Sequence, residues 1–270
     1  MNEMNFRYRV EIGNYLKYPV STKVSHKFLT SFDAATPDFI LHFTDCEAAM
    51  NPLSILLPEC LISETQPGCP VVLQPDGLSL GGCNLPVGNA ICQIEHPELV
   101  DSEMLQENLS RIKRSISLFG RSSAVSHTIA NLGRSDAPVA EAIKLLNTGS
   151  TDLSLFTAFV GAGEGLTPSF DDFLAGMLFV DRFYGYNRFI VSESFFEIAA
   201  ARTTRQSVQQ YRFAANGHFS RQFEQFAVDL VRRHIDNSEL LRLLAWGHSS
   251  GTDILCGIWH YLSRQVRING

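Results

Sequence analysis

The chain has 270 residues, of which 45% are apolar, so it can fold as one large domain or two smaller ones with a real core. Its formal net charge of -6 argues against a protein that binds nucleic acid or anionic membranes through a broad basic face. A local basic pocket for a small anion is still compatible with that charge.

Neither a secretory signal nor a membrane span is expected. Residues 1–15 lack an apolar segment, and no apolar run approaches the ~18 residues that cross a bilayer. We therefore expect a cytoplasmic protein without membrane association. The six cysteines form no C-x-x-C pair and no zinc-binding spacing, and we expect small buried hydrophobes in a reducing compartment. The six cysteines are Cys46, Cys60, Cys69, Cys83, Cys92 and Cys256.

The first part of the chain predicts short strands separated by Gly, Pro and Asn turns. The strand-like runs are Phe39–Phe43, Ser54–Leu57, Pro70–Gln74 and Ala90–Glu95. The segment Leu73–Gly82, LQPDGLSLGG, predicts the tip of a hairpin. This pattern is typical of a compact antiparallel sheet or a small barrel.

The period of the apolar residues becomes helical from about Leu99. The expected helices are 101–119, Ala137–Gly149, Phe195–Gly217, Arg221–Ile235, Ser238–Trp246 and Thr252–Val266. We therefore predict an α+β protein with an N-terminal, antiparallel β-rich domain (residues 1–98) and a C-terminal helical domain (residues 99–270).

A glycine-rich stretch lies in the middle of the helical part. It runs from Gly161 to Phe179 and reads GAGEGLTPSFDDFLAGMLF. Gly161, Gly163 and Gly165 permit positive φ and close approach to another group. Such a loop before a helix can bind phosphate or carboxylate through unpaired N–H groups. The pattern matches neither the P-loop nor the dinucleotide-binding fingerprint, so it is weak evidence by itself.

The residues after the glycines predict the start of a helix. Thr167 suits the N-cap, with Pro168 in the first helical position. Ser169 and Asp172 also have capping-box spacing, which would place the cap two residues later. Asp171 and Asp172 repel a bare anion unless a cation intervenes. They either hold Mg²⁺ that in turn holds phosphate, or accept hydrogen bonds from a substrate amide or amine.

A second stretch, Gly247–Trp259, repeats the first. Ser250, Asp253, Leu255 and Gly257 align with Ser169, Asp172, Leu174 and Gly176. One sequence thus makes the same helix start twice, and we expect the two starts to face one shared pocket. The alternative is that Ser-x-x-Asp only caps each helix and that the glycines only ease packing.

These two motifs together resemble those of the AllH-like proteins, formerly a family of unknown function. The resemblance extends more loosely over most of the chain, including Thr204–Phe219 with Ser207 and Gly217 at matching places. It implies a subunit of oxamate carbamoyltransferase, which interconverts oxalurate and phosphate with oxamate and carbamoyl phosphate in allantoin breakdown. It also implies two further, unrelated protein subunits.

The resemblance and the residues together give a set of candidate site residues. The candidate catalytic residues are His248, Asp171 and Asp172, and the candidate substrate-binding residues are Gly161, Gly163, Gly165, Thr167, Ser169, Ser207, Ser249, Ser250 and Asp253. The expected ligand is a small anion: carbamoyl phosphate, oxalurate or oxamate. No cofactor is certain, and Mg²⁺ is the candidate metal. The alternatives are a non-catalytic scaffold subunit or a small-anion sensor.

Two residues depart from the family pattern. Glu164 stands where Pro is frequent and adds a charge beside the loop, and Phe170 stands where Gly or a polar residue is common. A bulky Phe170 ring is expected either to narrow the pocket or to line it. The helix residues Arg202, Arg205 and Arg212 are explained more simply by a solvated helix face than by the site.

Overall fold

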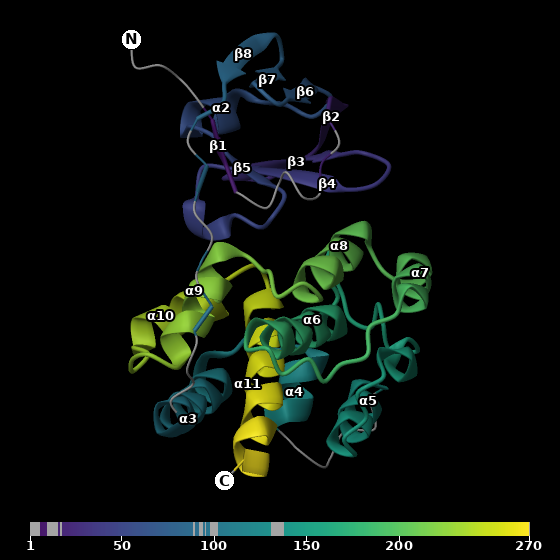
Figure 1. Cartoon of the computed structure of the whole chain (residues 1–270), viewed down its shortest axis with the longest axis vertical. Coiled ribbons are helices and arrows are strands. Elements are labelled where there is room, and N and C mark those ends of the chain that lie inside the picture. The colour runs from purple at the N-terminus through teal and green to yellow at the C-terminus, as the bar shows by residue number, and fades with distance from the viewer. Residues whose placement is uncertain are drawn as a thin grey trace. The chain divides into compact units, whose positions relative to one another are not determined.

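The computed structural model describes residues 6–9, 16, 18–88, 90–91, 94, 96–97, 102–130 and 138–269. The chain divides into two compact units (Figure 1). The β-rich unit holds Met1–Glu95 together with Phe219–Glu224, and the helical unit holds His96–His218 together with Gln225–Gly270. The domain boundary predicted between residues 98 and 99 lies outside the described residues.

The described strands of the β-rich unit form one sheet. They are β1 (Arg7–Tyr8), β2 (Val20–Lys27), β3 (Ser31–Ala35), β4 (Ile40–Thr44), β5 (Ser54–Leu56), β6 (Pro70–Gln74), β7 (Gly77–Leu80) and β8 (Cys83–Pro86). Their order in the sheet is β1-β5-β4-β3-β2-β6-β7-β8. All neighbours are antiparallel except β4 and β5, which run parallel. A short helix, α2 (Glu59–Glu64), and a 3₁₀ turn, η1 (Glu47–Ala49), complete the unit.

The two edges of this sheet approach each other. Phe6, next to β1, pairs with Val87, just after β8. The N–H of Ile91 donates to the carbonyl of Tyr8 at 2.8 Å. The sheet therefore curls toward a barrel, and the predicted α+β class with a small barrel or sheet is confirmed.

Local sequence explains most of these strands. Leu41 and Phe43 alternate with more exposed residues along β4, and the Phe43 ring stacks on Phe32 of β3 with centroids 4.6 Å apart. The predicted hairpin tip joins β6 to β7, with Gln74 opposite Gly77. The run at Ala90–Glu95 was expected as a strand, but its described part contributes only the isolated bridge at Ile91.

A buried ion pair fixes the segment Phe219–Glu224 within the β-rich unit. Arg9 Nη2 and Glu224 Oε1 are 2.8 Å apart, and their side chains are only 3% and 4% exposed. Arg9 Nη1 also donates to the carbonyls of Phe219 at 2.8 Å and Met50 at 3.1 Å. Because these groups are shielded from water, removing one partner would leave an uncompensated charge.

The helical unit contains nine helices in the described ranges, and all but the one at Ala124–Ala130 lie in segments where a helix was expected. They are α3 (Ser102–Phe119), α4 (Ala124–Ala130), α5 (Pro138–Asn147), α6 (Ser169–Phe183), α7 (Glu193–Arg202), α8 (Arg205–Ala214), α9 (Arg221–Leu230), α10 (Asn237–Leu244) and α11 (Ser250–Asn269), with a 3₁₀ turn, η2 (Leu153–Phe156). The first turn of α9 belongs to the β-rich unit. No helix in the described ranges is both long and apolar enough to cross a membrane.

The single helix expected over Phe195–Gly217 is wrong. The structure has two helices there, α7 and α8, separated at Thr203, whose backbone is extended. Thr204 starts the second helix, because its Oγ1 accepts a hydrogen bond from the N–H of Ser207 at 3.1 Å. A local capping hydrogen bond thus interrupts a continuous helical pattern.

The expectation that the cysteines are buried is also wrong for several of them. Cys46, Cys60 and Cys83 are exposed, whereas Cys256 is buried on α11. All five cysteines whose state the structure describes are free thiols. Cys92 lies outside the described residues.

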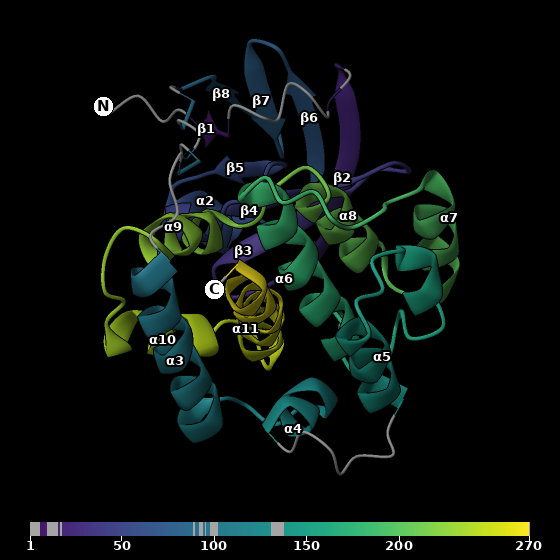
Figure 2. The ribbon, with the colours of Figure 1, turned by 60° about the horizontal axis from the view of Figure 1, so that its bottom comes forward.

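Helix α11 forms the centre of the helical unit. Figure 2 shows it almost end-on, with α3, α4, α6 and α10 around it. Its residues from Gly251 to Leu262 are all buried, and so are all but one of the residues of α6. A helix that is buried on every side must pack against neighbours all round, so α6 and α11 are core elements rather than surface helices.

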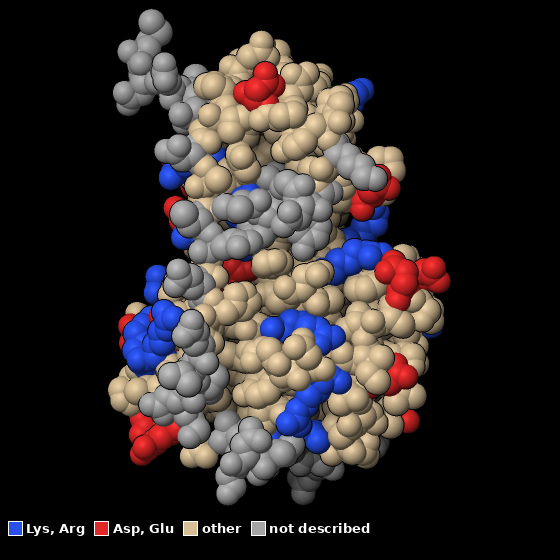
Figure 3. Space-filling view, viewed as in Figure 1, with Lys and Arg blue, Asp and Glu red and all other residues tan. Residues whose placement is uncertain are grey.

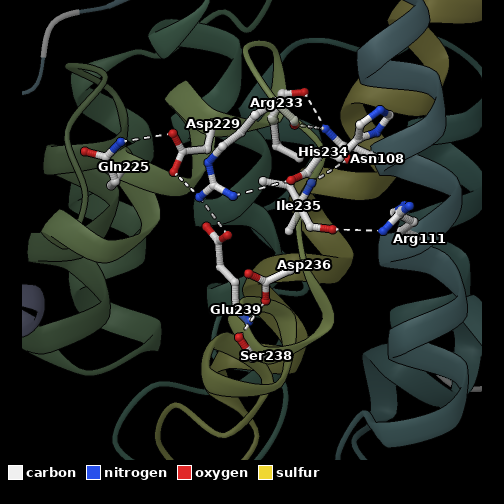
Figure 4. Close-up of polar contacts among 11 residues, drawn as sticks. Asn108, Arg111, Gln225, Asp229, Arg233, His234, Ile235, Asp236, Ser238 and Glu239 are labelled. Carbon is white, nitrogen blue, oxygen red and sulfur yellow. Dashed lines mark hydrogen bonds and ion pairs between the residues drawn. The ribbon is translucent and has the colours of Figure 1, made fainter.

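Polar contacts attach α3 to the turn between α9 and α10 (Figure 4). Buried Asn108 donates to the carbonyls of Leu230 at 2.9 Å and Arg233 at 2.8 Å, and its Oδ1 accepts from the N–H of Ile235 at 3.0 Å. Arg233 also contacts Glu239 of α10 at 2.8 Å. These bonds satisfy backbone groups that the turn would otherwise bury without partners.

The contact between α6 and α11 depends on two glycines. A Cβ atom on Gly176 would lie 2.5 Å from the carbonyl oxygen of Ile254, and one on Gly257 would lie 2.1 Å from that of Phe173. Gly176 and Gly257 are aligned positions of the two motifs, and so are Phe173 and Ile254. Each helix therefore places its motif glycine against a backbone carbonyl of the other helix. Only glycine allows the two backbones to approach so closely.

Replacement of Gly257 by Ala tests this contact. Helix propensity alone predicts a gain of about 1 kcal/mol from Gly→Ala. The clash with the Phe173 carbonyl predicts instead a loss of about 3 kcal/mol in the free energy of unfolding. Urea denaturation of Gly257→Ala and Gly176→Ala distinguishes the two signs, and a gain in stability would contradict the close contact.

Candidate functional site

The two motifs place their helix starts side by side. Helix α6 begins at Ser169 and α11 at Ser250, the two residues that align in sequence. Thr167 Oγ1 and Ser250 Oγ are 3.1 Å apart and share a hydrogen bond. The structure thus brings together two helix starts that are distant in the chain. The pocket expected between them stays a prediction.

Both expected caps of α6 are wrong. The N-cap is Pro168, with φ -55° and ψ 146°, and no side chain caps this end. Ser169 is the first helical residue, and Thr167 instead contacts Ser250. The extended ψ of Pro168 excludes it from the helix, although its fixed φ is compatible with a first helical position.

The first N–H groups of α6 are already used by the loop. The N–H of Phe170 donates to the carbonyl of Ala162 at 3.0 Å, and the next two N–H groups donate to Pro168 at 2.9 and 3.1 Å. Gly163 packs so close that a Cβ there would lie 2.5 Å from the nitrogen of Ser169. The loop therefore covers this helix end, and an anion would have to bind to side chains or to the exposed part of the loop.

The glycine loop has the backbone geometry expected for it. Gly161, Gly163 and Gly165 have φ values of 84°, 121° and 94°, which side chains rarely permit. Gly163, Glu164 and Gly165 are exposed. Glu164 therefore adds a negative charge to the solvent side of the loop.

Phe170 packs in the core at the start of α6. Its side chain is fully buried, and its ring lies 5.8 Å from Phe159 and 6.2 Å from Phe173, centroid to centroid. The expectation that this ring narrows or lines the site is therefore replaced by a role in the core. Burial of such a ring anchors the start of α6.

Asp171 holds the loop to the neighbouring helices. Its Oδ1 accepts hydrogen bonds from the N–H of Gly161 and from the hydroxyl of Tyr211, both at 2.8 Å. Its Oδ2 accepts one from the hydroxyl of Thr203. With three donors on a buried carboxylate, Asp171 connects the glycine loop, the α7–α8 junction and α8. Capping alone did not explain this residue, and these contacts do.

Asp171→Ala is expected to loosen the loop. Removal of a buried acceptor leaves three donors unsatisfied, which costs about 1–3 kcal/mol for each group that water cannot reach. We expect a lower melting temperature and faster proteolysis within residues 161–167. Tyr211→Phe removes only one of the three donors and should have a smaller effect. Unchanged melting and proteolysis of Asp171→Ala would contradict this role.

Asp172 and Asp253 form the centre of the cluster. Both side chains are almost completely buried, at 1% and 0% exposed. Oδ1 of Asp172 accepts a hydrogen bond from Gln210 Nε2 at 3.2 Å, and Oδ1 of Asp253 accepts one from the hydroxyl of Ser123. The Oδ2 atom of each has no hydrogen-bond partner of good geometry among the described residues.

The two carboxyls influence each other across the helix pair. The pKa of Asp172 is raised to about 8, mainly by burial and to a smaller extent by the nearby charge of Asp253. The Ser250 hydroxyl has the opposite effect and lowers this pKa. Burial likewise raises the pKa of Asp253 to about 7, opposed by the hydroxyls of Ser123 and Ser169. Asp172 of α6 thus lies near Ser250, the first residue of α11, and Asp253 of α11 lies near Ser169, the first residue of α6. We call this arrangement reciprocal, because each helix makes the same contact with the other.

These pKa values predict a pH-dependent stability. Both folded-state pKa values lie above the ordinary 3.8, so the folded chain binds more protons than the unfolded chain at intermediate pH. The contribution is fully present below about pH 4 and is lost as the pH rises through about 7 and 8. We expect the melting temperature to fall between pH 5 and pH 8.5.

Asp172→Asn, which cannot ionise, should show a smaller fall than the unmodified chain. Asp236→Asn is the matched control, because Asp236 is an exposed helix cap where Asn serves equally well. Melting curves measured by circular dichroism over this pH range provide the comparison. Equal falls for Asp172→Asn and the unmodified chain would contradict the raised pKa.

The remaining predicted residues lie around this centre. Ser249 and Ser250 are half-buried, and His248 is exposed. Ser207 is buried on α8 and is linked to the loop through Thr204. The Thr204 hydroxyl donates to the carbonyl of Leu166 at 2.6 Å, and its Oγ1 lies 3.3 Å from Ser207 Oγ. Ser207 is therefore linked to the loop indirectly.

One basic residue was not predicted from sequence. Arg121 Nη1 donates to the carbonyls of Gly247 at 3.1 Å and His248 at 2.8 Å, while its N–H donates to Thr252 Oγ1 at 2.9 Å. An exposed positive charge thus lies beside the start of α11. Its only sequence signal is the Gly-Arg-Ser-Ser turn after α3, which resembles an ordinary helix end.

Other parts of the cluster were also not predicted. They are Ser123, Thr203, Gln210 and Tyr211, all of which donate to the acids of the two motifs. Three lie in the segment that was expected to be one helix. The arginines set aside from the site have other contacts: Arg202 donates to the carbonyl of Ala158 at 2.8 Å, and Arg212 pairs with Glu193 at 2.8 Å.

The surface of the helical unit is not uniformly acidic. On the face shown in Figure 3, Lys and Arg side chains gather in front of α6 and between α11 and α5. The described residues contain no group of three or more His, Cys, Asp or Glu side chains that could hold a metal ion.

The protein is thus an α+β protein with a paired cluster of acids and hydroxyls at two helix starts. Residues 159–262 match the family model described as oxamate carbamoyltransferase subunit AllH, which confirms the family resemblance of the two motifs. The match covers α6, the first 13 residues of α11 (Ser250–Leu262) and everything between them. The family's name indicates a subunit of an oxamate carbamoyltransferase, and a subunit implies other protein chains. No solved structure matches the chain.

Proposed function

We propose that the chain binds the small carbamoyl-bearing anion of an oxamate carbamoyltransferase at the junction of α6 and α11. The reaction converts oxalurate and phosphate into oxamate and carbamoyl phosphate in allantoin breakdown, in the cytoplasm, in a complex with two further subunits. The observation that carries the proposal is the reciprocal cluster of buried acids and partly exposed hydroxyls within the matched segment. Two buried carboxyls that each keep an Oδ2 atom without a well-formed hydrogen bond among the described residues are unusual in a purely structural core.

Donors for the negative end of the ligand surround this cluster. Thr167, Ser249 and Ser250 are partly exposed residues with hydroxyl groups, and Gly163 and Gly165 belong to the exposed part of the loop that precedes α6. Arg121 adds positive charge at the start of α11. Carbamoyl transfer passes through a tetrahedral centre with a negative oxygen, which such donors stabilise.

The acidic residues take different roles in this proposal. Asp171 positions the loop, because its oxygens already have three donors. Asp172 and Asp253 remain available to the ligand. His248 is exposed next to the second helix start, where it can donate to the ligand or exchange a proton with it.

A second candidate function is a scaffold subunit without a ligand of its own. The observation that favours it is the start of α6, whose first N–H groups are occupied by the loop. By this account the helix pair supports an interface with the other subunits. The exposed Leu166 at the tip of the loop, 52% accessible, would belong to that interface.

Ligand binding by the isolated chain distinguishes these functions. We expect calorimetry to detect binding of oxamate and carbamoyl phosphate. Ser250→Ala should weaken it about tenfold, because a hydrogen bond to a charged group contributes about 1.5–3 kcal/mol. Ser110→Ala, at an exposed position on α3, is the matched control and should bind normally. A complex that turns over equally with Ser250→Ala, together with no binding by the chain, would support the scaffold instead.

A further inference from the structure

The geometry points to a subsite for the ligand's amino group, an inference that rests on the proposed function. We infer that Asp172 and Asp253 together bind the terminal NH₂ of a carbamoyl or oxamate group, each accepting one of its two N–H bonds on Oδ2. The ligand class is thus a primary amide or ureide that carries an anion at its other end. This assigns the two acids to substrate recognition rather than to helix capping.

The first support is the unequal use of the two oxygens on each acid. Oδ1 of Asp172 is held by Gln210, and Oδ1 of Asp253 is held by Ser123. Oδ2 of both lacks a well-formed hydrogen bond among the described residues, although both side chains are buried. Each carboxyl is therefore fixed in orientation by one oxygen. The hydroxyls of Ser250, near Asp172, and of Ser169, near Asp253, lower the two pKa values but complete no well-formed hydrogen bond to Oδ2. A buried acceptor without a donor costs stability, and an N–H from a ligand removes that cost.

The second support is the symmetry of the helix pair. Asp172 and Asp253 occupy the same position relative to their helix starts, at Ser169 and Ser250. At Gly176 and Gly257 the two helices lie so close that neither position has room for a Cβ atom. The acids therefore approach one junction from opposite helices. A planar NH₂ group carries two N–H bonds that diverge, and two acceptors from two sides match it.

Asp171 does not qualify for this role. It lies beside Asp172 in sequence, but its oxygens receive the N–H of Gly161 and the hydroxyls of Thr203 and Tyr211. Its aligned position in the second motif is Thr252, whose Oγ1 already accepts the N–H of Arg121. Only Asp172 and Asp253 combine burial, a spare acceptor and matching positions.

The charge of the pair is compatible with an anionic ligand. Burial raises the pKa of Asp172 to about 8 and that of Asp253 to about 7, so the pair retains protons near neutral pH. A protonated carboxyl still accepts a hydrogen bond through its carbonyl oxygen. The repulsion that two full charges would exert on the ligand's anionic end is thereby reduced. The partly exposed Thr167 and Ser250 extend the polar cluster from these acids toward solvent.

Two pairs of ligands test the inference on the unmodified chain. Oxamate and pyruvate share a carboxylate and a carbonyl, and differ only in NH₂ against CH₃. Carbamoyl phosphate and acetyl phosphate differ in the same way. A site built for the amino group should bind oxamate at least about tenfold more tightly than pyruvate, because a methyl group leaves both acceptors unpaired. Calorimetry or competition binding measures the ratio.

Variants of the two acids then show which residues distinguish oxamate from pyruvate. Asp172→Asn and Asp253→Asn keep the shape but can direct an N–H toward the ligand's own N–H, and each should bring the ratio of oxamate to pyruvate affinity close to one. Asp236→Asn, at the exposed cap of α10, is the matched control and should keep the ratio of the unmodified chain.

The possible results separate this inference from the proposed function. Equal binding of oxamate and pyruvate by the unmodified chain would overturn the amino-group subsite and leave the anion-binding function standing. Binding of neither would overturn both. Because the ligand pairs are compared on the unmodified chain, the inference stays testable even if an Asn variant fails to fold. The inference would also be overturned if correctly folded Asn variants kept the oxamate to pyruvate affinity ratio of the unmodified chain.

Discussion

The close packing of α6 against α11 is the constraint on which the rest of the structure depends. Gly176 and Gly257 have no side chains to separate the helices, so each faces a backbone carbonyl of the other helix. That approach brings together the two helix starts and removes Asp172 and Asp253 from water. Burial raises the pKa of both acids and leaves each with a spare oxygen. The proposed ligand site is thus a consequence of how two helices pack.

The burial of Asp172 and Asp253 lowers the stability of the fold, and in our proposal it also provides acceptors for the ligand. Two buried acids cost free energy, and each pKa unit of upward shift corresponds to about 1.4 kcal/mol at a pH where the group would otherwise ionise. Such a cost is typical of sites at which a ligand supplies the missing partners. Asp171 shows the contrast, since its oxygens already receive three donors. In our proposal Asp171 therefore supports the loop, whereas the adjacent Asp172 contacts the ligand.

Much of the fold follows from local sequence patterns, whereas the site depends on contacts between distant segments. The β-rich class, the hairpin before Gly77 and the repeated start at Ser169 and Ser250 could be predicted, because turn residues and spacing encode them. The break at Thr203 could not, since one capping hydrogen bond overrides a helical pattern. Arg121 joins the cluster only through tertiary packing, which no local signal records.

The central claim is that one small amide ligand sits between the two acids. A crystal structure of the chain soaked with oxamate tests this claim most directly. The account predicts the oxamate nitrogen within about 3 Å of Oδ2 of both Asp172 and Asp253, with its carboxylate toward the partly exposed hydroxyls. Oxamate bound elsewhere, or bound here with its nitrogen directed away from the acids, would contradict it.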